Sequence, residues 1–423
     1  MFEFEINEII KNIKTEKDIS KGMYLKLTQG IYDIGTDENN LLYYIENESY
    51  INMYTNIQKK VWFKLDIKVR NNLTYKFFTK EFNTLFLNNY LNPKAKVEIN
   101  IQYFNKYFQK LEKKEFSVVT KIYGLNVTPN NTSLKLGNYL LCDYAFFNES
   151  FRPMHNLVHI NPDFKKFPKG DIDNCFIINE KISAINSDIA IELFYREVET
   201  FINLIIFCTA WCCNENEKIS CLNTFTRASY LVIDNTEETY LMGMSDKSIL
   251  NPRYYLNEEF FARNNYKKLF KFLNNENLTQ LEKKLLICAD WIGQSMRTNN
   301  LTQRYTFLCI ALESLLSSKS SGIMDQSITS RLREFSAFLY TEDINKRYEI
   351  YKKIPDLYNK RSEISHSGQS KKLTLENYHE LLDILYPIVK KVLGLSENLK
   401  TMDDLNNYIL KQKNIPIPEH QAE

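Results

Sequence analysis

Residues 354–368 read Ile354-Pro-Asp-Leu-Tyr-Asn-Lys-Arg-Ser-Glu-Ile-Ser-His-Ser-Gly368, a stretch that predicts a short helix with a marked beginning and end. Pro355 suits a first helical turn, where its missing N–H has no partner to lose. Asp356 favours the positive end of the helix dipole. Gly368 is the residue type that commonly ends a helix in the left-handed conformation. We therefore expect a helix from 355 to 367.

Arg361 and His366 lie inside this helix. At ~3.6 residues per turn, positions five apart are about 140° apart around the axis, so the two side chains flank one broad polar face. Arginine is a permanent cation whose planar fork suits phosphate, and histidine can move a proton near neutral pH. The pair indicates metal-free RNA cleavage, in which a ribose 2′-OH attacks its own 3′-phosphate. His366 then acts as general base or acid, and Arg361 stabilises the charge of the transition state.

The Arg–His spacing is weak evidence by itself. The chain has twelve arginines and five histidines, and chance alone produces such a spacing in roughly two chains in five. A second match, Arg152-Pro-Met-His-Asn-Leu-Val-His159, contains a proline and overlaps a strand-like segment. We interpret it as structural, and we favour a structural role over metal binding for His155 and His159.

Composition and charge are those of an ordinary soluble protein. The 423 residues suffice for about two domains, and 44% are hydrophobic and 25% charged. The formal net charge of +2 gives no chain-wide basic field. Between Lys346 and Lys372, however, eight Lys or Arg stand against three Asp or Glu. This local excess of five charges fits either a solvated face or an electrostatic approach for a polyanion.

The cysteines and the apolar runs indicate a reducing compartment and no membrane span. The eight cysteines form no Cys-x-x-Cys pair and no Cys/His zinc spacing. The acidic N-terminal residues do not resemble a signal peptide. The most apolar run, Phe201–Trp211, is shorter than the ~20 residues of a membrane helix. We expect a cytoplasmic protein that needs no metal or other cofactor and does not bind membranes.

Residues 1–185 are predicted to form a β-rich domain of mainly antiparallel strands. Val61–Val69 alternates apolar and polar residues, as a half-buried strand does. Further predicted strands are Val97–Ile101, Phe116–Tyr123 and Cys175–Ile178. Residues rich in Pro, Asn and Gly separate several of these runs.

The pattern becomes helical after about residue 185. Apolar residues recur at helical spacing from Asp188 to Cys212, and a strand pair is predicted at 229–233 and 239–242. Thr279-Gln-Leu-Glu282 is a capping box at the start of a helix, and Leu301–Leu315 has the clearest apolar stripe. Further helices are expected at 326–340, 343–353, 355–367 and 374–394, the last with a kink at Pro387.

The predicted fold class is therefore α+β. A β-rich N-terminal domain (1–185) precedes an all-α helical bundle (186–395), of which 300–395 has the clearest pattern. Residues 396–423 are expected to be a C-terminal tail, with one loosely attached helix and a Pro-containing end.

Sequence motifs of other common chemistries are missing. The eleven glycines form neither a phosphate-binding loop nor a dinucleotide fingerprint. The chain also has no Gly-x-Ser-x-Gly elbow and no acidic cluster typical of two-metal nucleases. The Arg361–His366 pair is the candidate site that is left.

Three segments in order resemble a known family. They are Arg304-Tyr-Thr-Phe-Leu-Cys-Ile-Ala-Leu-Glu-Ser-Leu-Leu316, Ile328-Thr-Ser-Arg-Leu-Arg-Glu-Phe-Ser-Ala-Phe-Leu339 and Leu357-Tyr-Asn-Lys-Arg-Ser-Glu-Ile-Ser-His-Ser-Gly368. Their order is similar to the Apea-like branch of the HEPN superfamily. The likeness covers about 300–395 well and 190–300 loosely, and the N-terminal half is similar in kind to the domain that accompanies Apea-like proteins.

This resemblance implies a metal-independent endoribonuclease in prokaryotic defence against phage, often one that halts growth. Arg361 and His366 match the Arg-x4–6-His motif of the family, whose site is usually completed in a homodimer. Many members have a polar residue, often Asn, after the arginine, where this chain has Ser362. Lys360, Ser362 and Ser365 are candidate supporting or RNA-binding residues. Glu313 is a candidate either for orienting Arg361 or for plain helix pairing.

Two other classes of function stay open at this point. Some HEPN domains bind RNA or nucleotide, or dimerise, without cutting. The chain could also be a partner protein in a toxin–antitoxin or defence complex whose chemistry lies in another chain. The N-terminal domain (1–185) is expected to be a sensing or regulatory module, the ribonuclease reading included, and it is a candidate site for a phage-derived or nucleotide trigger.

Overall fold

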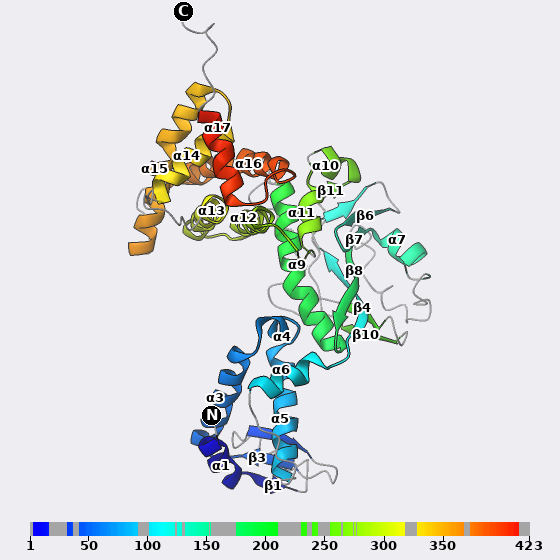
Figure 1. The fold of residues 1–423 in the computed structure, drawn as a ribbon. Coiled ribbons are helices and arrows are strands. Elements are labelled where there is room, and N and C mark those ends of the chain that lie inside the picture. Colours follow the sequence, from blue (N-terminus) through cyan, green and yellow to red (C-terminus); the bar gives the residue numbers. More distant parts are fainter. Residues whose placement is uncertain are drawn as a thin grey trace, which may run out of the picture. The chain divides into compact units, whose positions relative to one another are not determined.

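The computed structural model describes most of the chain, in two compact units (Figure 1). Unit 1 comprises residues 1–116 and 183–193, and unit 2 comprises 117–182 and 194–423. Within them, the described residues are 3–16, 32–36, 42–91, 101–122, 125–128, 132–151, 153, 175–209, 230–234, 239–243, 254–263, 265–273, 275, 277–317, 328–367 and 373–413.

Unit 1 combines a small antiparallel sheet with helices. The three strands pair in the order β1-β3-β2. Its described elements are α1 (Glu3–Lys11), β1 (Lys14–Glu16), β2 (Tyr32–Thr36), β3 (Leu42–Ile45), α3 (Glu48–Lys64), α4 (Ile67–Asn71), α5 (Tyr75–Leu91) and α6 (Ile101–Gln109).

The core of unit 1 is largely aromatic. Tyr54 and Phe82 are fully buried, with their ring centroids 5.8 Å apart in an edge-on arrangement, which aromatic pairs favour. The Tyr54 hydroxyl donates to Asn83 Oδ1 at 2.9 Å, and Gln58 Nε2 donates to the same oxygen at 2.7 Å. The polar groups among these rings are therefore hydrogen-bonded, as burial requires.

The predicted strand at 61–69 is wrong, because this segment forms the end of α3 and all but the last residues of α4. Its apolar residues alternate in sequence, but only every second one is buried. Val61, Leu65 and Val69 are 1%, 4% and 6% exposed and are four residues apart, which is helical spacing. Phe63 and Ile67, between them, are 70% and 61% exposed. The apolar residues that alternate in sequence therefore lie on two different helical faces, one buried and one exposed, and not on one face of a strand.

Unit 2 contains a six-stranded sheet in the order β10-β9-β4-β8-β7-β6. The predicted strands at 116–123 and 175–178, and the strand pair near 230–242, are confirmed; β7 and β8 pair antiparallel, with Leu141 opposite Ile177. Two further strands, β5 and β11, pair in parallel. The strands are β4 (Lys114–Ile122), β5 (Leu125–Val127), β6 (Ser133–Leu136), β7 (Tyr139–Cys142), β8 (Cys175–Ala184), β9 (Tyr230–Asp234), β10 (Thr239–Gly243) and β11 (Tyr254–Leu256).

Helices form the rest of unit 2. The capping box is confirmed: the Thr279 hydroxyl accepts from the N–H of Glu282, whose carboxylate accepts from the N–H of Thr279. Short helical segments follow β7 (Tyr144–Phe146 and Phe147–Phe151). The main helices are α9 (Ser187–Thr209, which begins in unit 1), α10 (Glu258–Arg263), α11 (Lys267–Phe272), α12 (Gln280–Arg297), α13 (Leu301–Leu316), α14 (Ile328–Tyr340), α15 (Ile344–Ser367), α16 (Leu375–Leu395) and α17 (Met402–Lys413).

Two helix predictions near the C-terminus need correction. The segments 343–353 and 355–367 form one helix, α15, with Pro355 in its interior. An interior proline removes one backbone hydrogen bond at a cost of ~3 kcal/mol. Ile354 and Leu357, on either side of it, are buried, and their packing offsets this cost so that the helix continues. Helix α17 is firmly attached rather than loose, since Met402, Leu405 and Ile409 are all at most 1% exposed.

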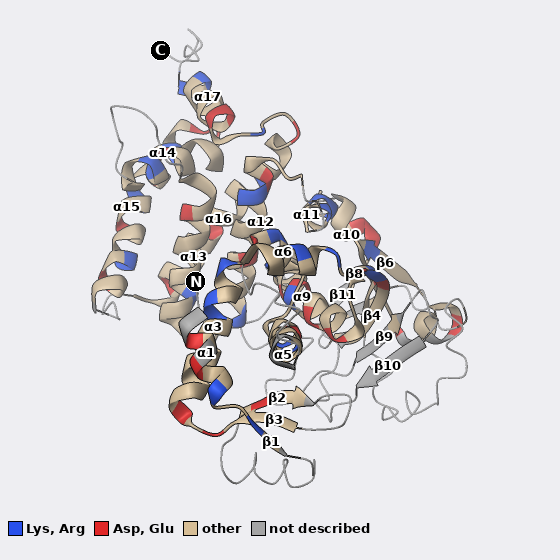
Figure 2. Cartoon of the chain, turned by 60° about the horizontal axis from the view of Figure 1, so that its bottom comes forward, with Lys and Arg blue, Asp and Glu red and all other residues tan. Residues whose placement is uncertain are grey.

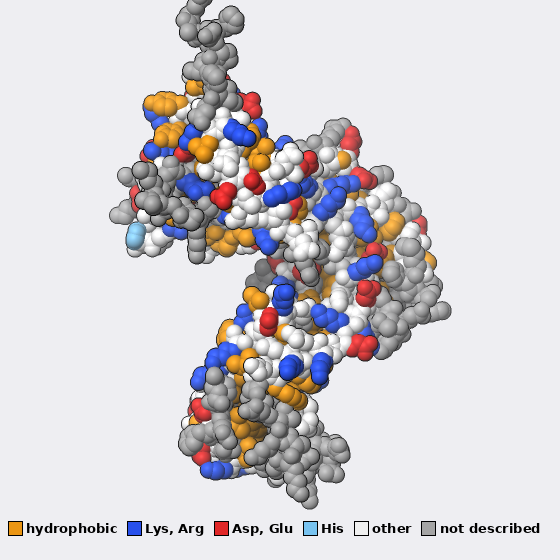
Figure 3. All heavy atoms as spheres, viewed as in Figure 1, with side chains coloured by type: hydrophobic (Ala, Val, Ile, Leu, Met, Phe, Trp, Pro, Cys, Tyr) orange, Lys and Arg blue, Asp and Glu red, His pale blue; other side chains and the backbone are white. Residues whose placement is uncertain are grey.

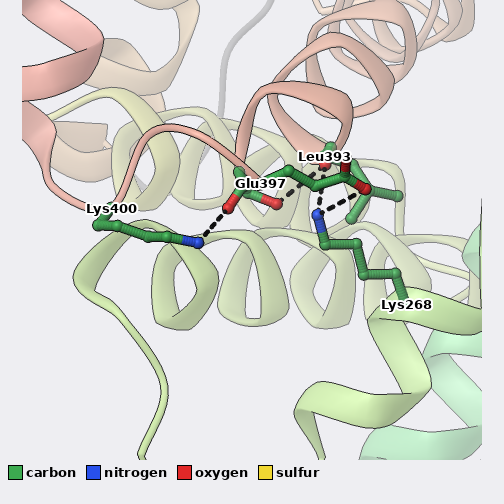
Figure 4. A network of polar contacts seen from close by, with 5 residues as sticks. Lys268, Leu393, Glu397 and Lys400 are labelled. Atoms are coloured by element: carbon green, nitrogen blue, oxygen red, sulfur yellow. Dashed lines mark hydrogen bonds and ion pairs between the residues drawn. The ribbon is translucent and has the colours of Figure 1, made fainter.

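The end of α16 is joined to α11 through lysine (Figure 4). Lys268 Nζ donates to the carbonyl oxygen of Leu393 at 3.3 Å and lies 3.5 Å from the carboxylate of Glu397. The last carbonyls of a helix lack partners within the helix, and cations are favourable at this negative end. The contact therefore caps α16 and ties it to the element beside the sheet.

The α+β class is confirmed, with antiparallel strands in the N-terminal region and a helical C-terminal part. The compact units do not follow the expected boundary at 185, because the sheet of β4 and β6–β10 belongs to the same unit as the helices. Residues 97–100, Arg152, His155 and His159 lie outside the described residues. Among the described helices, none is long and apolar enough to cross a membrane.

Helices α9 and α12 approach each other closely at Gly293. A Cβ added to this glycine would meet the backbone oxygen of Asn203 at 2.2 Å, so only glycine fits there. Asn203 Nδ2 donates to Asp290 at 2.7 Å, and Arg297 donates to Asn203 Oδ1 at 3.0 Å while pairing with Glu199. A polar network thus flanks this close approach of the two backbones.

Replacing Gly293 with alanine should destabilise unit 2 by about 3 kcal/mol, because the new methyl group overlaps backbone that cannot rotate away. Gly394 is the matched control, since a Cβ there meets nothing within 4 Å, and Gly394→Ala should be neutral or mildly stabilising. Thermal unfolding followed by circular dichroism compares the two. Equal melting temperatures for Gly293→Ala and the wild type would show that the helices can separate freely.

Candidate functional site

The candidate residues from 360 to 366 lie in the C-terminal part of α15. Buried Leu357 and Ile364 anchor this part of the helix to the bundle. Ser362, Ser365 and His366 are exposed, and Lys360 is half-buried. The helix therefore presents a polar surface that contains most of the predicted site residues.

A buried hydrogen bond fixes the register of α15 along α13. The hydroxyl of Tyr305, which is fully buried, donates to the carbonyl oxygen of Leu357 at 2.6 Å. Leaving a buried hydroxyl without a partner costs ~1–3 kcal/mol, so the two helices cannot slide along one another freely. This register brings residue 313 of α13 opposite residue 361 of α15.

Glu313 and Arg361 form an ion pair in this register. Arg361 Nε lies 3.1 Å from Glu313 Oε1, and the two side chains are 33% and 23% exposed. The N–H at Nε nevertheless makes no hydrogen bond, so at 3.1 Å the contact is a charge pair whose N–H does not point along the line to the oxygen. A guanidinium has five N–H donors, and the Arg361 side chain as a whole is one third exposed.

Tyr358 completes the arrangement. Its hydroxyl donates to Glu313 Oε1 at 2.9 Å, so one carboxylate oxygen serves both the tyrosine and the arginine. Burial, followed by the hydrogen bond and the negative charge of Glu313, raises the pKa of Tyr358 to about 12. The hydroxyl therefore stays protonated, and stays a donor, throughout the physiological range.

Cys309 lies one turn before Glu313 on α13 and is almost completely buried. Burial, reinforced by the charge of Glu313, raises the pKa of this thiol. The thiol is therefore neutral at physiological pH, and the charges at this place are those of Glu313 and Arg361. A buried, protonated cysteine acts as a small apolar residue rather than as a nucleophile.

The structure brings Arg361 together with Glu313, a contact that fits both readings of that glutamate, but it does not bring Arg361 into contact with His366. Along one α-helix the two positions are about 140° apart in rotation and ~7.5 Å apart in height. In the described part of the chain, the His366 side chain has no hydrogen-bond or ion-pair partner. Ser365 Oγ donates to the carbonyl oxygen of Arg361 at 3.0 Å, which is a local helix contact.

Tyr358 and Tyr305 are functional neighbours that the sequence reasoning missed. Tyr358 is three residues before Arg361 and so shares its helix face, a spacing that could have pointed to it. Tyr305 could not have been found in this way, since its partner Leu357 is 52 residues away in sequence.

Some of the basic side chains of α15 already have partners within unit 2. Lys353 pairs with Glu380 at 2.5 Å, and Arg347 donates to the carbonyl oxygen of Thr341 at 2.8 Å. Figure 2 shows basic residues along α15 with acidic ones between them. Basic and acidic side chains are thus mixed along α15. This mixture fits both interpretations of the positive segment 346–372, a solvated face and an electrostatic approach for a polyanion.

Comparisons with protein-family models, with curated proteins and with solved structures find no match to this chain. Among the described residues, no three His, Cys, Asp or Glu side chains are grouped so that they could hold a metal ion. The site is therefore defined by its own geometry. Arg361 pairs with Glu313, Glu313 accepts a hydrogen bond from Tyr358, and exposed His366 lies on the same helix as Arg361.

Replacing Glu313 with glutamine should reduce the free energy of unfolding by about 1 kcal/mol, because the ion pair is lost and the Tyr358 hydrogen bond is weakened. The same change at the exposed Glu349 of α15 should have a smaller effect. Chemical denaturation of both variants measures the difference.

A second measurement checks the cause. The pKa of Tyr358 should fall toward its ordinary value in Glu313→Gln, since the negative charge that raises it is gone, and ultraviolet titration with Tyr358→Phe as reference would detect this. An unchanged titration would contradict the contact.

Proposed function

We propose that this protein is a metal-independent endoribonuclease of the HEPN type that acts in the cytoplasm in prokaryotic defence against phage. The observation that carries the proposal is the position of Arg361. Its side chain is held by Glu313 and flanked by Tyr358 without being fully covered, and it shares one helix with exposed His366. The three sequence segments that resemble the HEPN family are the helices α13, α14 and α15 that build this place.

The proposed reaction needs two proton transfers and one charge to be stabilised. A base removes the proton of a ribose 2′-OH, whose oxygen attacks the adjacent phosphorus. The bond from phosphorus to the 5′-oxygen of the next nucleotide breaks, and an acid protonates that oxygen. The products are a 2′,3′-cyclic phosphate and a 5′-hydroxyl end. His366 serves as base or acid, and Arg361 donates to a non-bridging oxygen whose negative charge grows in the transition state.

A homodimer would supply the second histidine that one copy of the chain lacks. One histidine cannot be base and acid at once in the same step, whereas two copies facing each other bring two. His366 is exposed near the end of α15 and is thus open to a second copy. Lys360, Ser362 and Ser365 are proposed to contact RNA phosphates next to it.

The alternative is an RNA- or nucleotide-binding or dimerisation module that does not cut, within a toxin–antitoxin or other defence complex. The observation that favours it is the ion pair itself, since an arginine neutralised by Glu313 in its own chain can serve helix pairing alone. Under this alternative, Arg361→Ala weakens binding or folding while no RNA is ever cleaved.

His366→Ala should lower RNA cleavage about 10²–10⁴-fold, the usual worth of a positioned acid or base. The assay incubates purified protein with total bacterial RNA in EDTA and counts 2′,3′-cyclic phosphate ends by sequencing. His379→Ala is the matched control, because His379 is another exposed histidine, on α16, and should retain activity.

Arg361→Lys separates charge from shape. Lysine keeps the positive charge but loses the planar fork, so partial activity is expected, against near-complete loss in Arg361→Ala. Cleavage that persists in both His366→Ala and Arg361→Ala would rule out this site, and the absence of cleavage by the wild type with retained RNA binding would favour the non-catalytic module.

A further inference from the structure

The end of α3, helix α4 and the start of α5 in unit 1 expose apolar side chains. Phe63 and Ile67 are 70% and 61% exposed, and Tyr75 is 38% exposed. Half-buried Trp62 lies edge-on to Tyr75, with ring centroids 5.6 Å apart. The ring contact holds Tyr75 beside Trp62, which Phe63 follows in sequence. The exposed side chains thus come from one short segment, called here the 59–80 surface after the residues that form it.

The same segment is the most basic part of unit 1. Residues 59–80 contain seven Lys or Arg and one Asp, a net charge of +6, whereas residues 1–58 contain five Lys and ten Asp or Glu, a net charge of −5. All six lysines of the segment are exposed. Figure 3 shows basic side chains gathered over the α4 and α6 part of unit 1, with apolar side chains among them. Because the whole chain is near neutral, this charge is a local concentration.

Local contacts hold the surface in shape. Asp66, the acidic residue of the segment, caps α4 by accepting from the N–H of Lys68 at 2.8 Å, and its own N–H donates to Asn105 of α6. Asn72 accepts from Lys113 at 2.8 Å, which adds another lysine to the edge of the surface. Asp66 is thus engaged with backbone, and the positive charges around it are held on a rigid base.

We propose that the 59–80 surface binds single-stranded nucleic acid. Lysines along three consecutive helices can follow a phosphate backbone, whose contacts supply most of the affinity of such sites. Exposed aromatic rings between the lysines offer faces on which bases stack, the second common component of these sites. The charge and the rings together match this ligand better than charge alone would. This inference concerns binding by unit 1 and stands whether or not α15 carries a nuclease.

An anionic membrane surface is the competing ligand class, because it also attracts lysines next to exposed apolar residues. Membrane-bound helices present a continuous apolar face, whereas α4 has five residues and exposes one large apolar side chain, Ile67. The exposed rings are separated by charged positions instead. The surface therefore favours nucleic acid, and a membrane becomes an outcome of the test.

The test uses the full chain carrying His366→Ala, so that no cleavage consumes the probe. Fluorescence anisotropy follows binding of a labelled oligouridylate of about 20 nucleotides, long enough to cross the surface. The variant Lys68→Gln/Lys76→Gln/Lys80→Gln should bind at least about tenfold more weakly and lower the salt-dependence slope by ~2, since three phosphate contacts are removed. The control Lys271→Gln/Lys283→Gln/Lys411→Gln removes as many exposed lysines from unit 2 and should bind normally.

Phe63 gives a second, independent readout. Phe63→Ala should weaken binding about tenfold without changing the salt slope, and Phe63→Tyr should restore it, because stacking needs a ring and not a charge.

Two results would overturn the proposal. One is equal oligonucleotide affinity for the surface triple variant and its control, with circular dichroism showing both folded. The other is failure to bind the oligonucleotide while sedimenting with phosphatidylserine vesicles through Phe63 and Ile67, which would assign the surface to membranes.

Discussion

The hydrogen bond from Tyr305 to the carbonyl of Leu357 is the constraint on which the candidate site depends. It joins α13 to α15 through two residues that are 52 positions apart in sequence. Because the Tyr305 hydroxyl is buried, leaving it without a hydrogen bond would cost free energy. With this register set, Glu313 meets Arg361 and Tyr358. A shift of one turn along the helix, ~5.4 Å, would separate all three. The chemistry proposed for α15 is therefore a property of the α13–α15 pair rather than of the α15 sequence.

The arrangement also explains how an arginine can be both structural and available. Glu313 is shared between a tyrosine that stays protonated and a guanidinium that makes a charge contact without a directed Nε hydrogen bond. A carboxylate in this position orients the arginine, and it also reduces the charge that Arg361 offers to a phosphate. The first effect favours the proposed ribonuclease and the second favours its alternative, so the same ion pair is central to both proposals.

Charge in this protein is segregated rather than abundant. The chain is nearly neutral, yet residues 59–80 carry a net charge of +6 next to an acidic N-terminal segment. On α15, by contrast, several basic residues are paired within the bundle. The two proposals together assign binding of single-stranded nucleic acid to unit 1 and cleavage of RNA to unit 2, in different parts of the chain.

Local sequence by itself determined the elements whose signals act over a few residues. The capping box at Thr279, the helix from 301, the strands near 116 and 175, and the strand pair near 230 follow from short-range hydrogen bonding and periodicity. Arg361 and His366 were candidates because of their spacing, and Glu313 was a candidate because its segment resembles a known family. Tertiary structure alone decided three things. It continued α15 through Pro355 because burial of Ile354 and Leu357 outweighs one lost hydrogen bond. It turned the alternation at 61–69 into two helical faces, because only Val61, Leu65 and Val69 have a core to enter. It also placed Tyr305 under Leu357. All three outcomes depend on contacts between segments that are far apart in sequence, and a local sequence pattern carries no information about such contacts.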